Sequence, residues 1–392
     1  MSIAAKIQAV LEKASWIRKM FEEGAQLKAT YGADKVFDFS LGNPNLEPPA
    51  RFKETLIQVA GASGTGHHSY MPNIGYASVR QAVAEFVSTE QGTPVTANEV
   101  IMTCGAAGAL NVMLKAILDP GDEVITPAPY FVEYGFYVDN HGGVLKTVPT
   151  KSDFTLDLGA IEGAITAKTK AVLINSPNNP SGQIYAEESL AQLGSLLEKQ
   201  GRRFKRTIYL ISDEPYRKIA FDGIRVPALF TCYPESMIAT SYSKDLSIPG
   251  ERIGFLAVNP QSTYKEDLLA GMALANRTLG YVNAPALMQR AIESLQGVSV
   301  DIGAYQAKRD LLCHGLSECG YEFIRPKGAF YLFPKSPAPD DVAFVRALQE
   351  ELILTVPGRG FGCPGFFRIA FCVDDDTIKK AMPGFKRVLK QF

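Results

Sequence analysis

The sequence contains few of the residues that build metal sites and disulfide frameworks. Its 392 residues include six cysteines and four histidines. The cysteines are scattered along the chain and no Cys-x-x-Cys pair occurs. We therefore expect neither a zinc site nor any other metal site, nor a disulfide framework, and reduced thiols in the cytoplasm are the simpler interpretation.

The chain also lacks an excess of charge and a long apolar segment. The 40 lysines and arginines nearly balance the 41 aspartates and glutamates, which gives a formal net charge of −1. No run of about 18 apolar residues occurs, and the charged N-terminal stretch lacks the apolar centre of a signal peptide. We therefore expect no nucleic-acid partner, no membrane partner and no export.

The length and the pattern of apolar residues predict two domains of an α/β protein. From about residue 105 to 258, strand-like runs alternate with helical patterns, which predicts a mostly parallel sheet with helices on both faces. Past residue 285 a long helical stretch runs to Cys319, and short strands and a closing helix follow. We predict a large domain at 46–285 and a smaller α+β domain formed by 1–45 and 286–392.

Polar side chains follow the predicted strands at their carboxyl ends, where open sheets of this kind bind ligands. Asp213 ends "IYLISD", Asn179 lies in "NSPNNPSG", and Ser241, Ser243 and Lys244 lie in "SYSKDLSIPGERIG". Aspartate and asparagine at strand ends are often only caps and turn residues. A buried aspartate can, however, also hold a cationic ring nitrogen.

Two further features fit a phosphate group. Arg252 provides a fixed cation suited to bidentate contact, and small residues at Gly105–Ala107 open a predicted helix, whose free amides bind anions. An amine, a phosphate cradle, a carboxylate and hydrogen-bonding groups together fit pyridoxal phosphate bound to Lys244.

The order of these motifs resembles the class I and II aminotransferases of the fold-type-I pyridoxal-phosphate superfamily. The similarity extends from "FDFSLGNPN" through "YMPNIGYASVR", "NSPNNPSG", "SDEPY" and "SYSKDLSIPGERIG" to "GFFRIAF". It implies a large domain built on a mostly parallel seven-stranded sheet flanked by helices. It also implies ping-pong transfer of an amino group between an amino acid and a 2-oxo acid.

The resemblance assigns roles to residues that match the family's motifs. Lys244 would bind the cofactor covalently and move the substrate proton, and Asp213 would pair with the pyridine nitrogen. Asn179 and Tyr216 would contact the ring hydroxyl. The phosphate would be held by Gly105, Ala106, Ala107, Ser241, Ser243 and Arg252.

Further matches concern the ring, the partner subunit and the substrate. Tyr130 matches the aromatic residue that stacks on the cofactor, and Tyr70 matches a tyrosine that reaches the neighbouring subunit's phosphate, which implies a homodimer with shared active sites. Arg368, Gly42 and Asn179 match groups that contact the substrate α-carboxylate and its surroundings.

Some of these motifs also match other classes of protein. Ser241-x-x-Lys244 also fits the signature of a serine acyl-enzyme, but the companion S-D-N and K-T-G motifs are missing. A regulator on the same fold would need an added DNA-binding domain, for which the chain has no basic stretch. A carbon–sulfur β-lyase or another reaction on the same cofactor stays open.

The amino-acid donor is also open between alanine, aromatic residues and aspartate. In one branch of dicarboxylate-specific relatives a lysine occupies the place of Ala107. In another an arginine lies five residues before Asn-Pro-Pro, whereas here Arg277 lies six residues before Asn283.

Overall fold

The centre of the molecule is a seven-stranded sheet. The computed structural model describes residues 3–12, 16–62, 64 and 66–392. The strands lie in the order β2 (Val100–Thr103), β8 (Gly254–Val258), β7 (Ser236–Ser241), β6 (Tyr209–Asp213), β5 (Thr169–Asn175), β3 (Glu123–Ala128) and β4 (Val144–Pro149). β8 is antiparallel to both of its neighbours, and the remaining pairs are parallel. The predicted seven-stranded, mostly parallel sheet is therefore confirmed.

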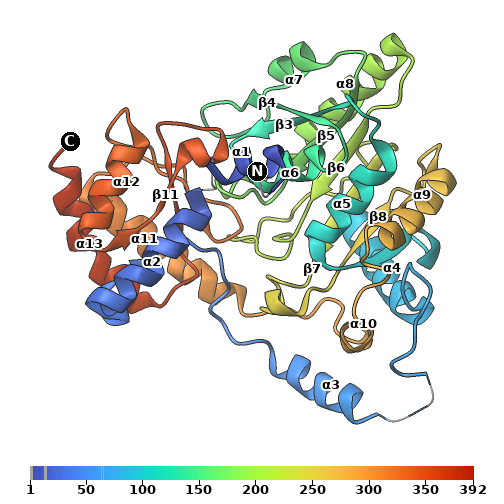
Figure 1. Ribbon diagram of the computed structural model, residues 1–392, viewed down its shortest axis with the longest axis horizontal. Coiled ribbons are helices and arrows are strands. Elements are labelled where there is room, and N and C mark those ends of the chain that lie inside the picture. Colours follow the sequence, from blue (N-terminus) through green and yellow to red (C-terminus); the bar gives the residue numbers. More distant parts are fainter. Residues whose placement is uncertain (1–2, 13–15, 63, 65) are drawn as a thin grey trace.

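Helices cover both faces of this sheet (Figure 1). One face packs against α3 (Ala50–Gly61), α4 (Ala77–Gln91), α7 (Leu158–Ala164), α8 (Glu187–Phe204) and α10 (Ala286–Glu293). The other face packs against α5 (Gly105–Ile117), α6 (Glu133–Asp139) and α9 (Lys265–Thr278). In β5, Val172 and Ile174 belong to the first core and Ala171 and Leu173 to the second. Because side chains alternate along a strand, burial on both faces explains the continuous apolar run "AVLIN".

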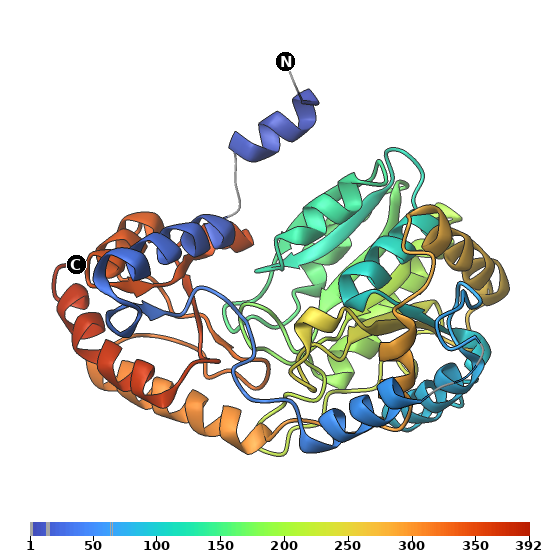
Figure 2. The same cartoon turned by 60° about the horizontal axis from the view of Figure 1, so that its bottom comes forward.

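A second lobe carries the C-terminal elements and the first part of the chain (Figure 2). It has its own hydrophobic core and two small sheets, β1–β10 and β11–β12–β9. Its elements are α2 (Trp16–Tyr31), β1 (Phe37–Asp38), α11 (Ile302–Cys319), β9 (Tyr331–Leu332), α12 (Asp341–Glu350), β10 (Ile353–Leu354), β11 (Val356–Pro357), β12 (Phe367–Ala370) and α13 (Asp375–Leu389). The pairing of β1 with β10 joins the N-terminal segment to this lobe.

Short elements complete the described chain. They are α1 (Ala5–Glu12) and the 3-10 helices η1 (Ala33–Lys35), η2 (Ala97–Glu99), η3 (Pro249–Glu251) and η4 (Gly358–Phe361). α1 stands away from both lobes in Figure 2, and Lys6 pairs with Asp139 of α6. Among the described residues, no helix is both long enough and apolar enough to span a membrane.

The structure corrects one feature of the sequence interpretation. The helical stretch predicted to run from residue 285 to Cys319 consists of two helices, α10 and α11, separated by residues 294–301. Gly297 in this connection has a φ of 80°, a left-handed conformation that favours glycine and does not continue a helix. Met288 and Ile292 of α10 pack in the core of the large sheet. The division of the chain after residue 285 stays a prediction.

Candidate active site

A cavity of about 250 Å³ lies beyond the carboxyl ends of the parallel strands, between the sheet and the second lobe. The residues that line it lie at many positions between Leu41 and Arg368, so residues far apart in the sequence meet here. Eleven of the sequence-predicted site residues line it: Gly42, Ala106, Ala107, Asn179, Asp213, Tyr216, Ser241, Ser243, Lys244, Arg252 and Arg368. This is the position at which open α/β sheets bind ligands.

Lys244 supplies an amine to this cavity. It follows β7 in the turn that leads to η3, and its Nζ donates a hydrogen bond of 3.0 Å to the carbonyl of Gly42. Its ammonium lies 5.8 Å from the ring centre of Tyr216 and 5.5 Å from that of Phe330. Burial lowers the pKa of Lys244 from 10.5 to about 8, because the surroundings solvate the charged form poorly. A larger share of this amine is therefore neutral, and so nucleophilic, near neutral pH.

Asp213 supplies a buried carboxylate at the end of β6. Its Oδ2 accepts a hydrogen bond of 2.6 Å from the hydroxyl of Tyr134, while its buried Oδ1 has no partner. Burial raises the pKa of Asp213 from 3.8 to about 7. An unpaired buried carboxylate oxygen is costly unless a cation or a donor meets it. The site therefore fits a ligand that presents a protonated ring nitrogen to Oδ1.

Arg368 supplies a buried cation from β12. Its guanidinium donates to the Asn179 side chain at 3.1 Å and to the Ser40 carbonyl, and its Nε is buried without a partner. Its ring neighbours are Tyr331, at 4.6 Å, and Phe361, at 4.8 Å. Within the described part of the chain no carboxylate pairs with it. A planar, unpaired guanidinium that lines a cavity fits a substrate carboxylate.

The opposite end of the cavity can hold a phosphate. The hydroxyls of Ser241 and Ser243 lie 2.6 Å apart, and Arg252 NH1 donates to the Pro249 carbonyl at 2.8 Å. Gly105 has a φ of 73°, a backbone conformation that favours glycine, and a Cβ there would lie 3.1 Å from the Arg252 guanidinium. Exposed amides at a helix N-terminus and an adjacent arginine together attract a phosphate dianion.

Three predicted residues do not line the cavity. Tyr130 packs beside Gly362, and the next residue, Phe131, lines the cavity in its place. Gly105 lies behind Arg252, and Tyr70 is 91% exposed on the surface. The stacking role assigned to Tyr130 therefore lacks support from its position.

Several residues of the site were missed in the sequence. Tyr134 holds Asp213, Tyr331 donates to or accepts from the Tyr216 hydroxyl at 2.8 Å, and Tyr137 lines the cavity. Tyr134 and Tyr137 are three residues apart in "EYGFY" on α6, a helical spacing that places both on one face. The sequence pattern does not predict this short helix, so the three-residue spacing of the two tyrosines does not by itself place them in the site.

Comparison with known proteins agrees with this geometry. A family model described as "Aminotransferase class I and II" matches residues 34–384. An aspartate/prephenate aminotransferase from Thermus thermophilus is 34% identical over 373 residues, which cover 91% of this chain and 92% of that protein. The chain therefore belongs to the class I and II aminotransferases and is an aminotransferase.

Solved structures show the same fold. An aminotransferase from Eubacterium rectale superposes with a TM-score of 0.96 at 42% identity and covers 100% of this chain and 99% of that one. An aspartate aminotransferase from Thermus thermophilus, solved with maleate, has a TM-score of 0.88 at 30% identity over 99% of this chain and 100% of its own. The family resemblance stated from the motifs is confirmed.

Proposed function

We propose that this aminotransferase binds pyridoxal phosphate in the cavity at the strand ends and transfers amino groups between an amino acid and a 2-oxo acid by a ping-pong mechanism. The observation that carries the proposal is the convergence of the Lys244 amine and the unpaired Asp213 carboxylate oxygen on one cavity. Two arginines without carboxylate partners among the described residues, Arg252 and Arg368, line the same cavity. Two cations suit a ligand set with a phosphate and a substrate carboxylate.

The chain's own residues divide the work of holding the cofactor. Asp213 would accept the ring N–H, and Asn179 and Tyr216 would contact the ring hydroxyl. The phosphate would bind Arg252, Ser241, Ser243 and the amides of Ala106 and Ala107. When bound, pyridoxal phosphate supplies the electron sink that makes removal of the substrate's Cα proton feasible.

The same residues would also position the substrate and move its proton. Arg368 would hold the α-carboxylate, which orients the Cα–H bond toward Lys244. The neutral Nζ of Lys244 would accept that proton and return it, since a pKa near neutrality suits a general base. Tyr331 would keep the Tyr216 hydroxyl in place through their 2.8 Å contact.

The cofactor assignment can be tested without substrate. Lys244→Ala should abolish the visible absorbance of the lysine-bound cofactor and its borohydride-stable label, because no other lysine lines the cavity among the described residues. Lys170→Ala removes a lysine of β5 that does not line this cavity and should keep the label. Retention of the label in Lys244→Ala would refute the assignment. Product analysis separates transamination from β-elimination, because elimination yields pyruvate with ammonia or thiol.

For the amino donor, we propose an uncharged side chain, either aromatic or small and apolar. Beside Arg368, the cavity presents Leu41, Phe131, Tyr137 and Tyr331, and burial of such surface favours apolar groups. Arg277, the candidate cation for a distal carboxylate, is exposed on α9.

A donor screen with 2-oxoglutarate and with pyruvate as acceptors tests this preference. Aromatic amino acids or alanine should have a higher kcat/KM than aspartate, and Arg277→Ala should leave that order unchanged. A strong preference for aspartate that Arg277→Ala abolishes would show that Arg277 of a partner subunit reads the distal carboxylate.

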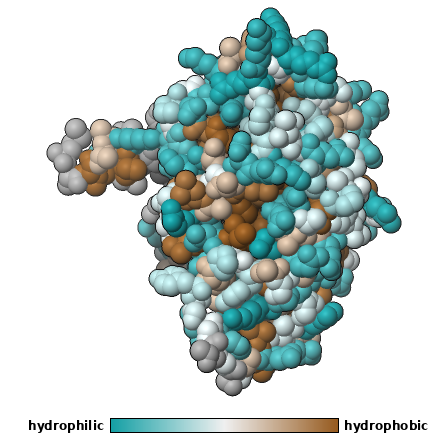
Figure 3. Space-filling view, turned by 90° about the vertical axis from the view of Figure 1, so that its right-hand side faces the viewer, coloured by the Kyte–Doolittle hydropathy of each residue, from teal (hydrophilic) through white to brown (hydrophobic). Residues whose placement is uncertain are grey.

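We also propose that the enzyme is a homodimer in which Tyr70 reaches the partner's phosphate site. Support comes from exposed apolar side chains, with Tyr70 91% exposed, Ile57 on α3 73% exposed and Leu274 on α9 53% exposed. Figure 3 shows apolar residues gathered near the centre of one face. Light scattering should give twice the chain mass, and Tyr70→Phe should raise the Kd for the cofactor without changing that mass.

A cytoplasmic location is proposed from the six free thiols.

A further inference from the structure

Two buried acidic residues directly follow the two central residues of the proposed cofactor site. Glu214 follows Asp213 and is 3% exposed, and Asp245 follows Lys244 and is 6% exposed. Neither acid lines the main cavity. Both instead line a separate, smaller cavity of about 30 Å³ together with Arg217 and Lys218. A cluster of charges therefore lies directly behind the proposed site.

Two consecutive cations pair with these acids. Arg217 NH1 lies 3.0 Å from Glu214 Oε2, and Lys218 Nζ lies 2.7 Å from Asp245 Oδ2. The side chains of the two cations are only 12% and 15% exposed. A buried charge is costly unless an opposite charge meets it, so each cation favours the ionised form of the acid it pairs with.

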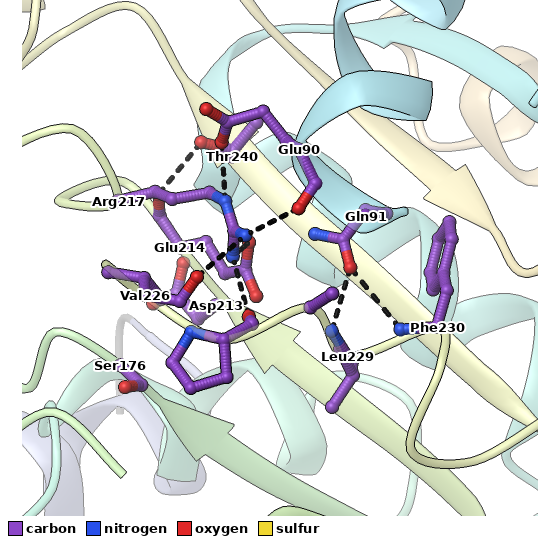
Figure 4. Close-up of polar contacts among 12 residues, drawn as sticks. Glu90, Gln91, Ser176, Asp213, Glu214, Arg217, Val226, Leu229, Phe230 and Thr240 are labelled. Carbon is purple, nitrogen blue, oxygen red and sulfur yellow. Dashed lines mark hydrogen bonds and ion pairs between the residues drawn. The ribbon is translucent and has the colours of Figure 1, made fainter. Parts of the chain in front are cut away.

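Nearly all hydrogen-bond donors of the Arg217 guanidinium have an acceptor. It also pairs with the carboxylate of Glu90 at the end of α4 and donates to the carbonyls of Glu90, Val226 and Pro227 at 3.0, 3.1 and 3.2 Å. Figure 4 shows these contacts converging on Arg217 from α4, from Glu214 in the turn after β6 and from the loop that contains Val226. This single side chain therefore ties three segments together next to Asp213.

The backbone around these acids is fixed as well. The Glu214 amide donates to the Ala239 carbonyl of β7 at 2.7 Å, and Thr240 Oγ1 donates to the Glu214 carbonyl at 2.9 Å. The Val300 amide donates to the Asp245 carbonyl at 2.7 Å. The turn after β6 and the turn after β7 are thus held together from behind the cavity.

We propose that the adjacent cations Arg217 and Lys218 are positioning residues of the cofactor site: they pair with Glu214 and Asp245, the acids that follow Asp213 and Lys244, and so hold Asp213 and Lys244 in place. This inference rests on the proposed cofactor. Under this inference, Asp213 is the uncompensated negative charge beside the ring nitrogen, because Arg217 pairs with the carboxylate of the neighbouring Glu214.

The electrostatic consequence has a definite sign. Among the described residues, the titratable groups around Asp213 are Tyr134 and Tyr137 from α6, Tyr216 from the turn after β6, Glu214 beside it and Lys244, which lines the same cavity. Glu90 of α4 faces Glu214 through Arg217. Above the pKa of Glu214, which burial raises, loss of the Arg217 charge would leave uncompensated negative charge on Glu90 and Glu214 near the cationic, protonated form of the bound cofactor. An anion nearby favours that protonated form and raises its pKa.

The test is a spectroscopic titration of the purified holoenzyme without substrate. Arg217→Met should raise the pKa at which the cofactor's visible absorbance band titrates. The expected increase is about one unit, as for an uncompensated charge nearby in a protein interior. Lys218→Met, which frees Asp245, should shift it in the same direction. Arg217→Lys keeps the charge and should restore a value near that of the wild type. The double variant Glu214→Gln/Arg217→Met removes both charges and should also return the pKa toward the wild-type value.

A matched control separates this effect from general destabilisation. Arg309 is another fully buried, ion-paired arginine, but it lies in the second lobe and pairs with Asp222 and Asp310. Arg309→Met should lower the melting temperature and leave the spectroscopic pKa unchanged. If Arg217→Met lowers the melting temperature but moves the spectroscopic pKa no more than Arg309→Met does, the positioning role is refuted. A wild-type protein that binds no pyridoxal phosphate would instead refute the proposed function itself.

Discussion

The charge of Asp213 depends on what occupies the cavity. Its carboxylate is buried, its Oδ1 has no partner, and burial raises its pKa from 3.8 to about 7. Without the cofactor, the folded chain keeps this proton until about pH 7, whereas the unfolded chain releases it near pH 4. The folded state therefore binds more protons, and the stability of the cofactor-free protein falls as the pH rises from about 4 to about 7.

The magnitude follows from the two pKa values. A shift of about 3 units corresponds to a cost of about 4 kcal/mol at pH 8, where both states have lost the proton. At pH 5 only the unfolded chain is largely ionised, and the cost is about 2 kcal/mol. Asp213→Asn carries no such charge and keeps an oxygen to accept the Tyr134 hydrogen bond. Its advantage in unfolding free energy over the wild type should be about 2–3 kcal/mol larger at pH 8 than at pH 5.

Urea unfolding of the cofactor-stripped wild type and variant at both pH values measures this difference. Asp376→Asn, a substitution on the exposed surface of α13, serves as the control and should show the pH dependence of the wild type. An advantage of Asp213→Asn that is equal at pH 5 and pH 8 would refute the reasoning. In the loaded enzyme the variant should lose its advantage, because Asp213 then has a cationic partner.

Three further predictions concern the same cavity. The rate at which the cofactor-free protein captures pyridoxal phosphate should rise with pH through a midpoint of about 8, the pKa of Lys244, and a stopped-flow profile that rises only near pH 10 would contradict this. Tyr134→Phe removes the one hydrogen bond that the Asp213 side chain accepts from the described residues and should weaken cofactor binding by about tenfold, or ~1.4 kcal/mol, in a fluorescence titration; unchanged binding would show that the bond has no such role. Gly42→Ala would place a Cβ 1.8 Å from the Tyr331 hydroxyl; it should raise the KM for the amino donor at least tenfold, and an unchanged KM would indicate that the loop moves freely.

The sequence predicts those parts of the fold and the site that depend on local patterns. Strands buried on both faces are continuous apolar runs such as "AVLIN", so the alternation of such runs with helical patterns predicts the parallel sheet. Asp213 and Lys244 follow such runs directly, and the carboxyl ends of parallel strands must meet at one edge. Their convergence on one cavity was therefore expected.

The tertiary structure decided what depends on contacts between distant segments. Tyr331 meets Tyr216 across 115 residues of sequence, and the Tyr134 hydroxyl reaches Asp213 across 79. No periodicity encodes such pairs, since each requires the second lobe or α6 to be docked on the sheet. The choice of Phe131 over Tyr130 was likewise set by how the segment before α6 lies against the cavity, because adjacent side chains point in different directions.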